Sequence, residues 1–385
     1  MMQLHTFLDA KPLFYDEIDY TRMPKAYASI AHHFPVPKII HIVGTNGKGT
    51  TGRFLASMLL ANKVRVGHYT SPHILDFNER IWLNGANVGN ETLEQAHQHL
   101  LSWLDSSLAS ALSYFEYTTL LAMVVYAHTC DYIVLEAGLG GEFDATNCFP
   151  KVLSVVTPIG YDHQAFLGES IEEIAQTKIN SVTNHLILAP QYESEVCAIA
   201  LAKTTALHTS LYDVGSYFDD KTSSEIDAYC QRQGLPEYLK NNFKTALCAL
   251  SVLGYGCDLS RFEPMLLNGR FQRLLPNVIV DVGHNVMAAE AIVKSLGKNK
   301  VVLVYNSYKD KDFKTILSIL KPVIKSILVI DIDSPRAVDE SLLYNVAKEL
   351  GVNISPFVQI QKDEEYVVFG SFSVVEAFLK GLRER

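Results

Sequence analysis

The sequence is poor in cysteine and has no paired cysteine motif. Its 6 cysteines are scattered over 385 residues, and no two form a C-x-x-C pair, so neither a zinc site nor a disulfide framework is indicated. Free thiols are typical of a reducing compartment. The N-terminus lacks the basic region of a signal peptide, and the longest apolar runs, such as 120–126, are too short to cross a bilayer. We therefore expect a cytoplasmic protein with no membrane partner.

Positive charge is also scarce. The chain has 33 Lys and Arg against 42 Asp and Glu, a net charge of -9, so it lacks the basic field that nucleic-acid binding usually requires. With 48% hydrophobic and 19% charged residues, the composition is that of a globular protein. We expect a monomer whose partners are small molecules and not nucleic acid. If its substrate is anionic, the cations that hold it must be placed locally.

Short β-branched runs alternate with longer helical patterns, which predicts an α/β fold with a mostly parallel, buried sheet. A second, shorter series of the same kind follows residue 269. We predict a larger domain over 1–268 and a smaller Rossmann-like domain over 269–385, joined at 269–276. The expected strands are 38–43, 64–69, 131–136, 152–157, 185–189, 278–282, 301–305, 327–331 and 366–369. The expected helices are 48–61, 91–104, 118–128, 171–181 and 338–350.

A glycine-rich loop follows the first of these strands. The strand 38–43 leads into G-T-N-G-K-G-T at 44–50, and a helical pattern comes next, which is the context of a phosphate-binding loop. Glycines let backbone N–H groups converge on phosphate oxygens, and a helix N-terminus favours the same charge. Lys48 can reach the β- and γ-phosphates, and Thr50 can offer a hydroxyl to Mg²⁺. We therefore predict ATP binding.

Two other kinds of nucleotide site are less consistent with the sequence. Residues 47–52 also fit the dinucleotide pattern G-x-G-x-x-G, but that site needs an acidic residue at the end of the next strand. The next strand ends in H-Y-T at 68–70, and the first acid is Asp76. A GTPase would carry N-K-x-D, and neither Asn62 nor Asn299 begins that sequence. A nucleoside triphosphate is favoured, although Gly49 separates the lysine from the threonine of the standard phosphate-loop motif.

The loop resembles that of the bifunctional folylpolyglutamate synthase and dihydrofolate synthase family, within the Mur ligase superfamily, and later motifs occur in the family's order. The resemblance extends from about residue 14 to the end of the chain. The later motifs are T-S-P-H (70–73), E-R-I (79–81), E-A-G-L-G-G (136–141), D-A-T-N (144–147), T-P-I-G-Y-D-H (157–163), L-G (167–168), G-R-F-Q (269–272) and D-V-G-H-N (281–285).

The resemblance implies an ATP-dependent, ADP-forming C–N ligase. Such an enzyme would join L-glutamate to dihydropteroate, to a tetrahydrofolate (poly)glutamate, or to both, through an acyl phosphate. It would use Mg²⁺ at two sites, in a phosphate-loop Mur-ligase-like domain followed by a Rossmann-like domain, with the active site in the cleft between them. Two alternatives stay open: a Mur-type ligase acting on a peptidoglycan precursor, and an ATP-binding regulator without ligase activity.

The resemblance also implies roles for individual residues. The expected ATP-binding residues are Gly44, Thr45, Asn46, Gly47, Lys48, Gly49, Thr50, Arg270, Asp281 and Asn285. The expected metal ligands are Thr50, Ser71, Glu136, His163 and Lys178. The expected catalytic residues are Lys48, His163, Lys178, Asp281 and His284. The expected substrate-binding residues are Ser71, Pro72, His73, Arg80 and Asp144.

Several of these residue types suit their roles, and each has a plainer alternative. Glu136 closes an apolar strand, where a carboxylate is costly without a partner and a hard cation is a suitable one; a salt bridge is the alternative. Ser71 follows a strand end, where α/β sheets place ligands, or it is simply a turn residue. A lone histidine such as His163 is more often structural, and Asn285 would otherwise cap a helix.

The chain departs from the family pattern at several positions. The family has E-K-A-G-I around a carbamylated lysine, whereas this chain has T-K-I-N-S at 177–181. Carbamylation of Lys178 is therefore a hypothesis, and a plain cation facing phosphate or solvent is the alternative. Glu142 stands where the family usually has arginine, which removes a positive charge near the substrate. The run K-D-K-D at 309–312 resembles the family's D-K-D loop or is a solvated face.

Overall fold

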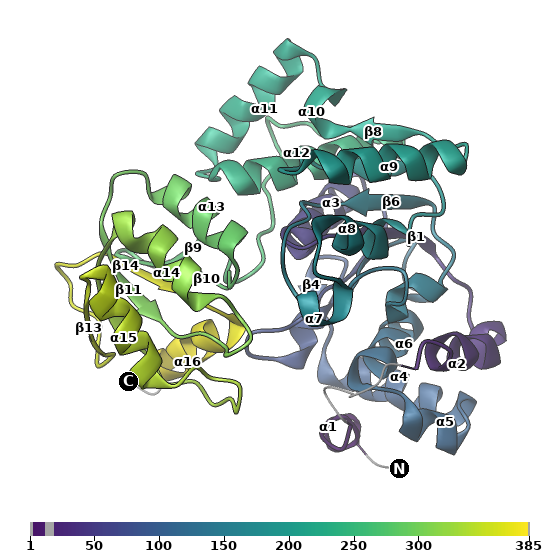
Figure 1. Ribbon diagram of the computed structural model, residues 1–385. Helices are drawn as coiled ribbons and strands as arrows, with labels where there is room; N and C mark the ends of the chain where they lie inside the picture. The colour runs from purple at the N-terminus through teal and green to yellow at the C-terminus, as the bar shows by residue number, and fades with distance from the viewer. Residues whose placement is uncertain (1–2, 12–18, 384–385) are drawn as a thin grey trace. The chain divides into compact units, whose positions relative to one another are not determined.

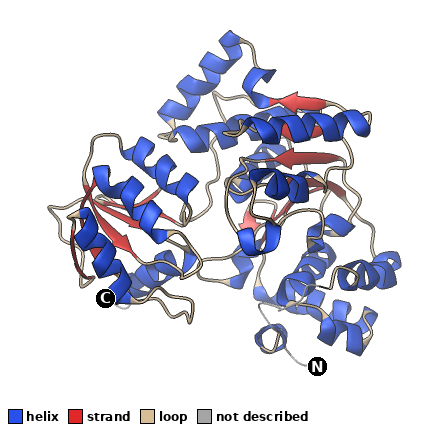
Figure 2. Ribbon diagram, viewed as in Figure 1, coloured by secondary structure: helices blue, strands red, loops and turns tan. Residues whose placement is uncertain are grey.

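The computed structural model describes residues 3–11 and 19–383. The chain forms two compact units, drawn in Figures 1 and 2. The first contains the residues up to Tyr229 together with Asn241–Met265, and the second contains Cys230–Lys240 together with Leu266–Arg385. Within each unit the strands are enclosed by helices (Figure 2), which is the layered arrangement expected of an α/β protein.

The first unit is built on an eight-stranded sheet with the order β4-β3-β2-β5-β1-β6-β7-β8. The six strands from β2 to β8 in this order pair in parallel, whereas β3 and β4 pair antiparallel at one edge. The strands are β1 (Lys38–Val43), β2 (Val66–Tyr69), β3 (Ile81–Leu83), β4 (Ala86–Asn87), β5 (Tyr132–Glu136), β6 (Leu153–Val156), β7 (Leu186–Leu188) and β8 (Leu211–Asp213).

The helices of the first unit follow from local patterns and caps. Ser113 and Ser170 each begin a helix through a capping box with the glutamate three residues later. The helices are α1 (Leu4–Asp9), α2 (Arg22–Ile30), α3 (Lys48–Ala61), α4 (Asn90–Trp103), α5 (Ser106–Ala111), α6 (Tyr114–Tyr126), α7 (Gln164–Leu167), α8 (Ile171–Ile179), α9 (Ser194–Ala206) and α10 (Val214–Tyr217). Helix α11 (Asp220–Arg232) ends within the segment Cys230–Lys240, and helix α12 (Glu237–Val252) begins within it.

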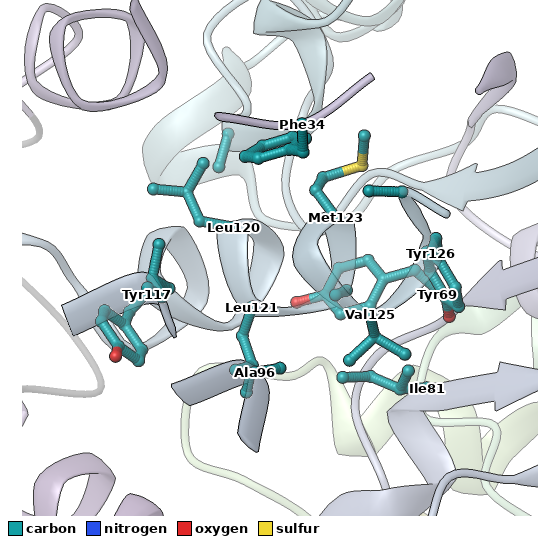
Figure 3. Close-up of a cluster of buried hydrophobic side chains, with 14 of the residues drawn as sticks. Phe34, Tyr69, Ile81, Ala96, Tyr117, Leu120, Leu121, Met123, Val125 and Tyr126 are labelled. Carbon is teal, nitrogen blue, oxygen red and sulfur yellow. The ribbon is translucent and has the colours of Figure 1, made fainter. Parts of the chain in front are cut away.

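A large hydrophobic cluster covers one side of the first sheet. Its centre is α6, which is apolar on nearly all faces and therefore buried. Figure 3 shows Leu120 and Met123 of this helix near Phe34, while Val125 lies near Ile81 of β3. These side chains are fully or almost fully buried, and burying a side chain of this kind stabilises the fold by about 1.5–3 kcal/mol. The cluster therefore stabilises this part of the first unit.

The second unit has a six-stranded sheet with the order β13-β12-β11-β14-β10-β9. All its pairs are parallel except β9 with β10. The strands are β9 (Gln272–Leu275), β10 (Val278–Asp281), β11 (Val301–Tyr305), β12 (Ile324–Val329), β13 (Asn353–Pro356) and β14 (Tyr366–Phe369). The helices are α13 (Val286–Leu296), α14 (Phe313–Leu320), α15 (Glu340–Leu350) and α16 (Phe372–Arg383).

The predicted fold class is confirmed: the protein is α/β, with two mostly parallel sheets. The expected strands 38–43, 301–305 and 366–369 and the helix 48–61 have the predicted bounds. The largest shift among the strands is β12, which begins at Ile324. The predicted domain boundary after residue 268 stays a prediction. The two compact units divide the chain differently, because the segment Cys230–Lys240 belongs to the second unit.

Over the described ranges 3–11 and 19–383, no helix combines the length and the apolar character that crossing a membrane requires.

Candidate active site

The phosphate loop turns sharply between β1 and α3. Gly44 has φ 147° and Gly47 has φ 85°, values that favour glycine. The backbone N–H groups of Thr45 and Asn46 donate to the Pro158 carbonyl at 2.9 and 3.2 Å. The Thr45 hydroxyl donates to the Gly160 carbonyl at 3.0 Å. The loop is thus fixed to the segment that follows β6, the strand paired beside β1.

Close contacts at the two glycines leave no room for a side chain. A Cβ atom on Gly44 would lie 2.0 Å from Thr157 Oγ1, and one on Gly47 would lie 2.5 Å from Asn242 Oδ1. Gly44 is required for space as well as for conformation, because the Thr157 backbone oxygen would also lie 2.9 Å from its Cβ. At Gly47 the positive φ favours glycine, and a side chain would displace the Asn242 amide. The tight packing sets the path of the loop into the N-terminus of α3, the end of a helix that favours an anion.

Two lysines converge on one carbonyl of this loop. Lys48 Nζ lies 3.2 Å from the Gly44 oxygen and 3.3 Å from the Thr45 oxygen. Lys178 Nζ, near the end of α8, donates to the same Gly44 oxygen at 3.1 Å. Burial of the Lys178 amine, with the nearby Lys48 charge, lowers the pKa of Lys178 to about 7, although Asp162 and Asp144 oppose the shift. Near neutral pH, a substantial share of Lys178 is therefore uncharged.

A carboxylate and two hydroxyl residues meet beside the loop at the carboxyl edge of the sheet. Glu136 ends β5 and is 4% exposed, and its Oε2 accepts from the Thr70 hydroxyl and from the Ser71 N–H, the latter at 3.3 Å. Strand β5 lies between β2 and β1, so Ser71 and Glu136 share this edge with the phosphate loop. Thr50 is buried in the first turn of α3.

His163 lies at the start of α7 and is the most exposed of the predicted metal ligands. Its backbone is left-handed, with φ 53°, which is uncommon for a residue other than glycine. Its side chain is 42% exposed, and Nε2 lies 3.9 Å from Asp162 Oδ1. The His163 N–H donates to the same Asp162 oxygen at 2.9 Å. The imidazole is therefore accessible and has an acidic neighbour.

No group of three or more His, Cys, Asp and Glu side chains in the described part of the chain is placed to hold a metal ion. The predicted ligand set differs in kind, because it also draws on the hydroxyls of Thr50 and Ser71 and on Lys178. Hydroxyl and carboxylate oxygens are ligands that suit Mg²⁺, which also keeps waters and binds phosphate oxygens. The donor chemistry at this sheet edge therefore fits Mg²⁺ held together with a nucleotide.

His73 and Arg80 form a pair next to Pro72, which follows a cis peptide bond. Arg80 Nε donates to His73 Nδ1 at 2.8 Å, and the guanidinium lies over the Tyr114 ring at 5.2 Å. Burial and then the Arg80 charge lower the pKa of His73 to about 4. His73 is thus a neutral acceptor at physiological pH. Two of the predicted substrate-binding residues, His73 and Arg80, are therefore joined to each other by a hydrogen bond.

Asp144 binds its own loop. Its Oδ2 accepts from the N–H groups of Gly138 and Leu139 at 3.0 and 2.9 Å, and its Oδ1 accepts from the Thr146 N–H and hydroxyl at 2.9 and 2.5 Å. Burial raises the pKa of Asp144, although these hydrogen bonds oppose the shift. Asp144 thus stabilises the conformation of its own loop. Its contact with substrate stays a prediction.

In the second unit the predicted residues gather where β10 ends. Asp281 is 5% exposed, and its carboxylate accepts from the N–H groups of Phe271 at 2.9 Å and Gly283 at 2.8 Å. The Arg270 guanidinium lies 4.9 Å from the centre of the Phe372 ring. His284 Nδ1 lies 3.1 Å from the Val282 carbonyl oxygen. Strand β10 pairs with β14 and β9, so this site too is at a strand end.

Asn285 and the charge run 309–312 have structural tasks. The Asn285 side chain accepts from the Ala288 N–H at 2.9 Å and caps α13, as expected if its role is structural. Asp310 forms a two-oxygen ion pair with Arg336 at 2.8 and 2.9 Å. Asp312 caps α14. An ATP contact by Asn285 stays a prediction.

Sequence reasoning missed Asn242, a residue of α12 within the first unit. Its side chain is 4% exposed, its oxygen lies against Gly47, and its Nδ2 has no hydrogen-bond partner. A buried amide without a partner is costly, and one at a phosphate loop suggests a ligand contact. No local motif could reveal it, because only the fold brings α12 to Gly47.

Comparison with known proteins found relatives of this chain. Residues 269–372 match the family model described as Mur ligase, glutamate ligase domain. The dihydrofolate synthase/folylpolyglutamate synthase of Escherichia coli strain K12 is 34% identical over 80% of this chain and 76% of its own length. The chain belongs to the dihydrofolate synthase/folylpolyglutamate synthase family.

Solved structures of this family share the whole fold. The crystal structure of Helicobacter pylori folylpolyglutamate synthetase is 40% identical, with a TM-score of 0.80 over 99% of this chain and 98% of that one. Escherichia coli FolC in complex with DHPP and ADP is 26% identical, with a TM-score of 0.80 over 100% and 98% of the two chains. Members of the dihydrofolate synthase/folylpolyglutamate synthase family thus resemble this chain over nearly its full length.

Proposed function

We propose that this protein is an ATP-dependent, ADP-forming ligase that joins L-glutamate to a folate-type carboxylate. The acceptor would be dihydropteroate, a tetrahydrofolate (poly)glutamate, or both. The observation that carries the proposal is the convergence of Lys48 and Lys178 on the Gly44 carbonyl, at a loop in which Gly44 and Gly47 have positive φ. Family membership supplies the reaction class, and the DHPP and ADP bound by the Escherichia coli relative support the substrates.

The reaction has two steps that conserve atoms and charge. A carboxylate oxygen of the acceptor attacks the γ-phosphorus of ATP, the bond from that phosphorus to the β-phosphate bridging oxygen breaks, and ADP leaves. The glutamate amine then attacks the acyl carbon of the resulting acyl phosphate. The tetrahedral intermediate loses inorganic phosphate and a proton, which leaves the amide. Fixed positive charge around the phosphates is the main requirement of the first step.

The phosphate loop supplies that charge and its direction. Backbone N–H groups between Gly44 and Thr50 and the N-terminus of α3 would hold the phosphates. Lys48 would leave its two loop carbonyls for the β- and γ-phosphates, where it would neutralise charge developed on ADP. Asn242 would donate its unpaired Nδ2 to the nucleotide. This last contact would satisfy an amide that the protein alone leaves unbonded.

We propose that Thr50, Ser71, Glu136, His163 and a modified Lys178 hold Mg²⁺ in two sites. When bound, Mg²⁺ would neutralise the phosphate oxygens and orient them for transfer. Carbamylation would convert the Lys178 amine into a carboxylate-like group, and it requires the uncharged amine. Burial of Lys178 beside Lys48 favours that uncharged form. A buried carbamate would also place a negative charge near Lys48.

Carbamylation can be tested on the folded enzyme. Protein equilibrated with ¹³C-bicarbonate should give a carbamate carbon signal in ¹³C NMR that the Lys178→Ala variant lacks. The Lys151→Ala variant is the matched control, because burial lowers the pKa of Lys151 to about 8 but this lysine is expected to have no metal role. If wild type and Lys178→Ala give the same spectrum with Mg²⁺ and ADP present, the modification is absent.

For the acceptor, we propose a place beside the loop 138–147. Tyr20 and Phe143 are more than half exposed, and their rings contact each other at a centroid distance of 4.3 Å. An exposed aromatic pair is suited to a flat heteroaromatic ring. His73 and Arg80 would line the same substrate through their bonded turn. In the second unit, Arg270, Asp281, His284 and Asn285 would serve ATP.

The deciding experiment is an ADP-release assay. Wild-type protein is given ATP, Mg²⁺ and L-glutamate, with dihydropteroate or a reduced folate added separately. We expect ADP release that depends on both glutamate and one acceptor. Turnover with a nucleotide-linked muramyl peptide alone would assign the enzyme to the peptidoglycan branch. ATP hydrolysis that ignores every acceptor would instead support a regulator.

We further propose that the protein acts as a cytoplasmic monomer. The scattered free cysteines are suited to a reducing compartment. Light scattering after gel filtration should give one species near the chain mass of 42.9 kDa. A mass twice that value would replace the monomer with a dimer.

A further inference from the structure

Tyr238 has no role in the proposed function, yet its hydroxyl contacts Asp281, one of the residues proposed to bind ATP. It lies in the first turn of α12, in the segment Cys230–Lys240 that belongs to the second unit. Its hydroxyl donates to Asp281 Oδ2 at 2.7 Å. Burial and the Asp281 charge hold the pKa of Tyr238 well above its usual value. The hydroxyl therefore stays protonated and donates to Asp281 throughout the physiological range.

The Asp281 carboxylate also organises the turn before β9. Besides Tyr238, its Oδ2 accepts from the Phe271 N–H at 2.9 Å, while its Oδ1 accepts from the Gly283 N–H at 2.8 Å. Phe271 has φ 46°, a left-handed conformation that is strained for a bulky residue. Such a conformation persists only where neighbouring groups impose it. Asp281 thus holds a strained turn, and Arg270 lies directly before its strained residue.

The arrangement makes Tyr238 the side-chain anchor of this turn. The N–H groups of Phe271 and Gly283 belong to the turns that the Asp281 carboxylate holds. They therefore give the carboxylate no attachment that is independent of those turns. Tyr238 comes from a helix 43 positions away in the sequence. It therefore supplies an attachment independent of the turn. The charge of Arg270 is also close enough to Tyr238 to affect its pKa, so the three groups form one cluster.

We propose that Tyr238 is a positioning residue for nucleotide binding. By holding the Asp281 carboxylate, its hydroxyl keeps the turn Gly269–Phe271 in the conformation that presents Arg270 to ATP. The inference rests on the proposed nucleotide roles of Asp281 and Arg270. It assigns Tyr238 no contact with the reacting atoms.

The test is the Tyr238→Phe variant, which removes one hydroxyl and keeps the ring. Affinity for ADP is measured by calorimetry, KM for ATP and kcat by the ADP-release assay, and Tm by calorimetry. We expect Kd for ADP and KM for ATP to rise about tenfold, with kcat at saturating ATP within a factor of two. The control is Tyr217→Phe, which removes a hydroxyl bonded to Ser251 at 2.9 Å and should leave all values unchanged.

A second variant separates positioning from a general effect on stability. Asp281→Asn should itself weaken ADP binding, and adding Tyr238→Phe to it should cause no further loss, because Tyr238 acts through Asp281. Unchanged Kd in Tyr238→Phe, or full additivity of the two substitutions, overturns the inference. So does a lower Tm with the same Kd.

The outcome also separates this inference from the proposed function. If the wild type binds ADP but ligates glutamate to none of the acceptors, the proposed function fails, and the Kd values still decide the role of Tyr238. If the wild type binds no ADP, both fail together.

Discussion

At the scale of single residues, burial decides the charge state of several polar side chains. His41 in β1 and His68 in β2 are nearly or fully inaccessible, and burial lowers the pKa of each well below 6.5. Arg53 strengthens the effect at His68, since its Nε donates to His68 Nδ1 at 3.2 Å. The same guanidinium lies 4.8 Å from the centre of the Trp82 ring. His68 is therefore a neutral acceptor inside the sheet.

This environment predicts acid sensitivity through His68. The folded pKa lies below the unfolded pKa, so between the two values the unfolded chain binds more protons, and stability falls as pH falls below about 6.5. His68→Asn keeps an acceptor near Arg53 but cannot titrate. We expect the wild type to be the more stable protein at pH 7 and its advantage to shrink by roughly 1 kcal/mol per pH unit towards pH 5.

The measurement is the free energy of unfolding of both proteins in urea at several pH values. Comparing the two proteins removes the contribution of His41, which titrates in the same direction and is present in both. A stability difference that stays constant from pH 7 to pH 5 would show that His68 does not titrate on unfolding.

At the scale of elements, the loop after β5 is attached to the end of α8. The Glu142 N–H donates to the Thr177 carbonyl at 2.9 Å, and Asn180 Nδ2 donates to Glu142 Oε2 at 2.8 Å. A Cβ atom on Gly141 would lie 2.6 Å from the Lys178 carbonyl oxygen. Glu142 and Asn180 are two of the positions at which this chain departs from the family pattern. These hydrogen bonds attach the loop to the helix end that carries Lys178.

We predict that the Glu142–Asn180 hydrogen bond contributes to turnover. Glu142→Ala should lower kcat/KM several-fold, whereas Glu142→Gln, which retains an acceptor oxygen for Asn180, should stay near wild type. In a double-mutant cycle with Asn180→Ala, the coupling energy should be about 1 kcal/mol. Equal losses for the Ala and Gln variants would mean that the charge of Glu142 matters and the hydrogen bond does not.

At the scale of the whole molecule, ligand binding should raise stability. A ligand that binds only the folded state stabilises it by about 2.7 kcal/mol at a hundred times its Kd. We predict that ADP with Mg²⁺ raises Tm by several degrees, and that excess chelator removes most of the increase. Lys48→Ala should keep the far-ultraviolet spectrum of the wild type yet lose the increase, together with at least about 100-fold in kcat.

Scanning calorimetry with and without ligand checks this prediction. Lys63→Ala is a suitable control, because Lys63 lies beyond the C-terminus of α3, at the opposite end of that helix from the phosphate loop. A Lys48→Ala protein that keeps both the Tm increase and its turnover would remove the phosphate-loop assignment.

The sequence by itself determined the parts of this protein that depend on local pattern. Short continuous apolar runs predicted β1, β11 and β14 with their bounds, because a parallel strand that is buried on both faces is apolar along its length. The phosphate loop was also predictable, because its glycines and Lys48 all lie within the seven residues 44–50, directly after a strand. The order of the later motifs predicted the family.

The antiparallel strands were beyond local pattern. β3, β4 and β9 are short and exist because they pair with a neighbour at a sheet edge. The segment 269–276, predicted only as a junction, contains β9. Strand pairing is a non-local property, so a run of two to four residues gives too little evidence by itself.

Only the tertiary structure decided which distant residues act together. It brought Asn242 to Gly47, Lys178 to the Gly44 carbonyl and Tyr238 to Asp281. These contacts join residues that are far apart in the sequence, and each depends on burial that no local pattern encodes. Burial also lowers the pKa of Lys178 to about 7. The sequence determined the kind of site, and the packing of distant elements decided its chemistry.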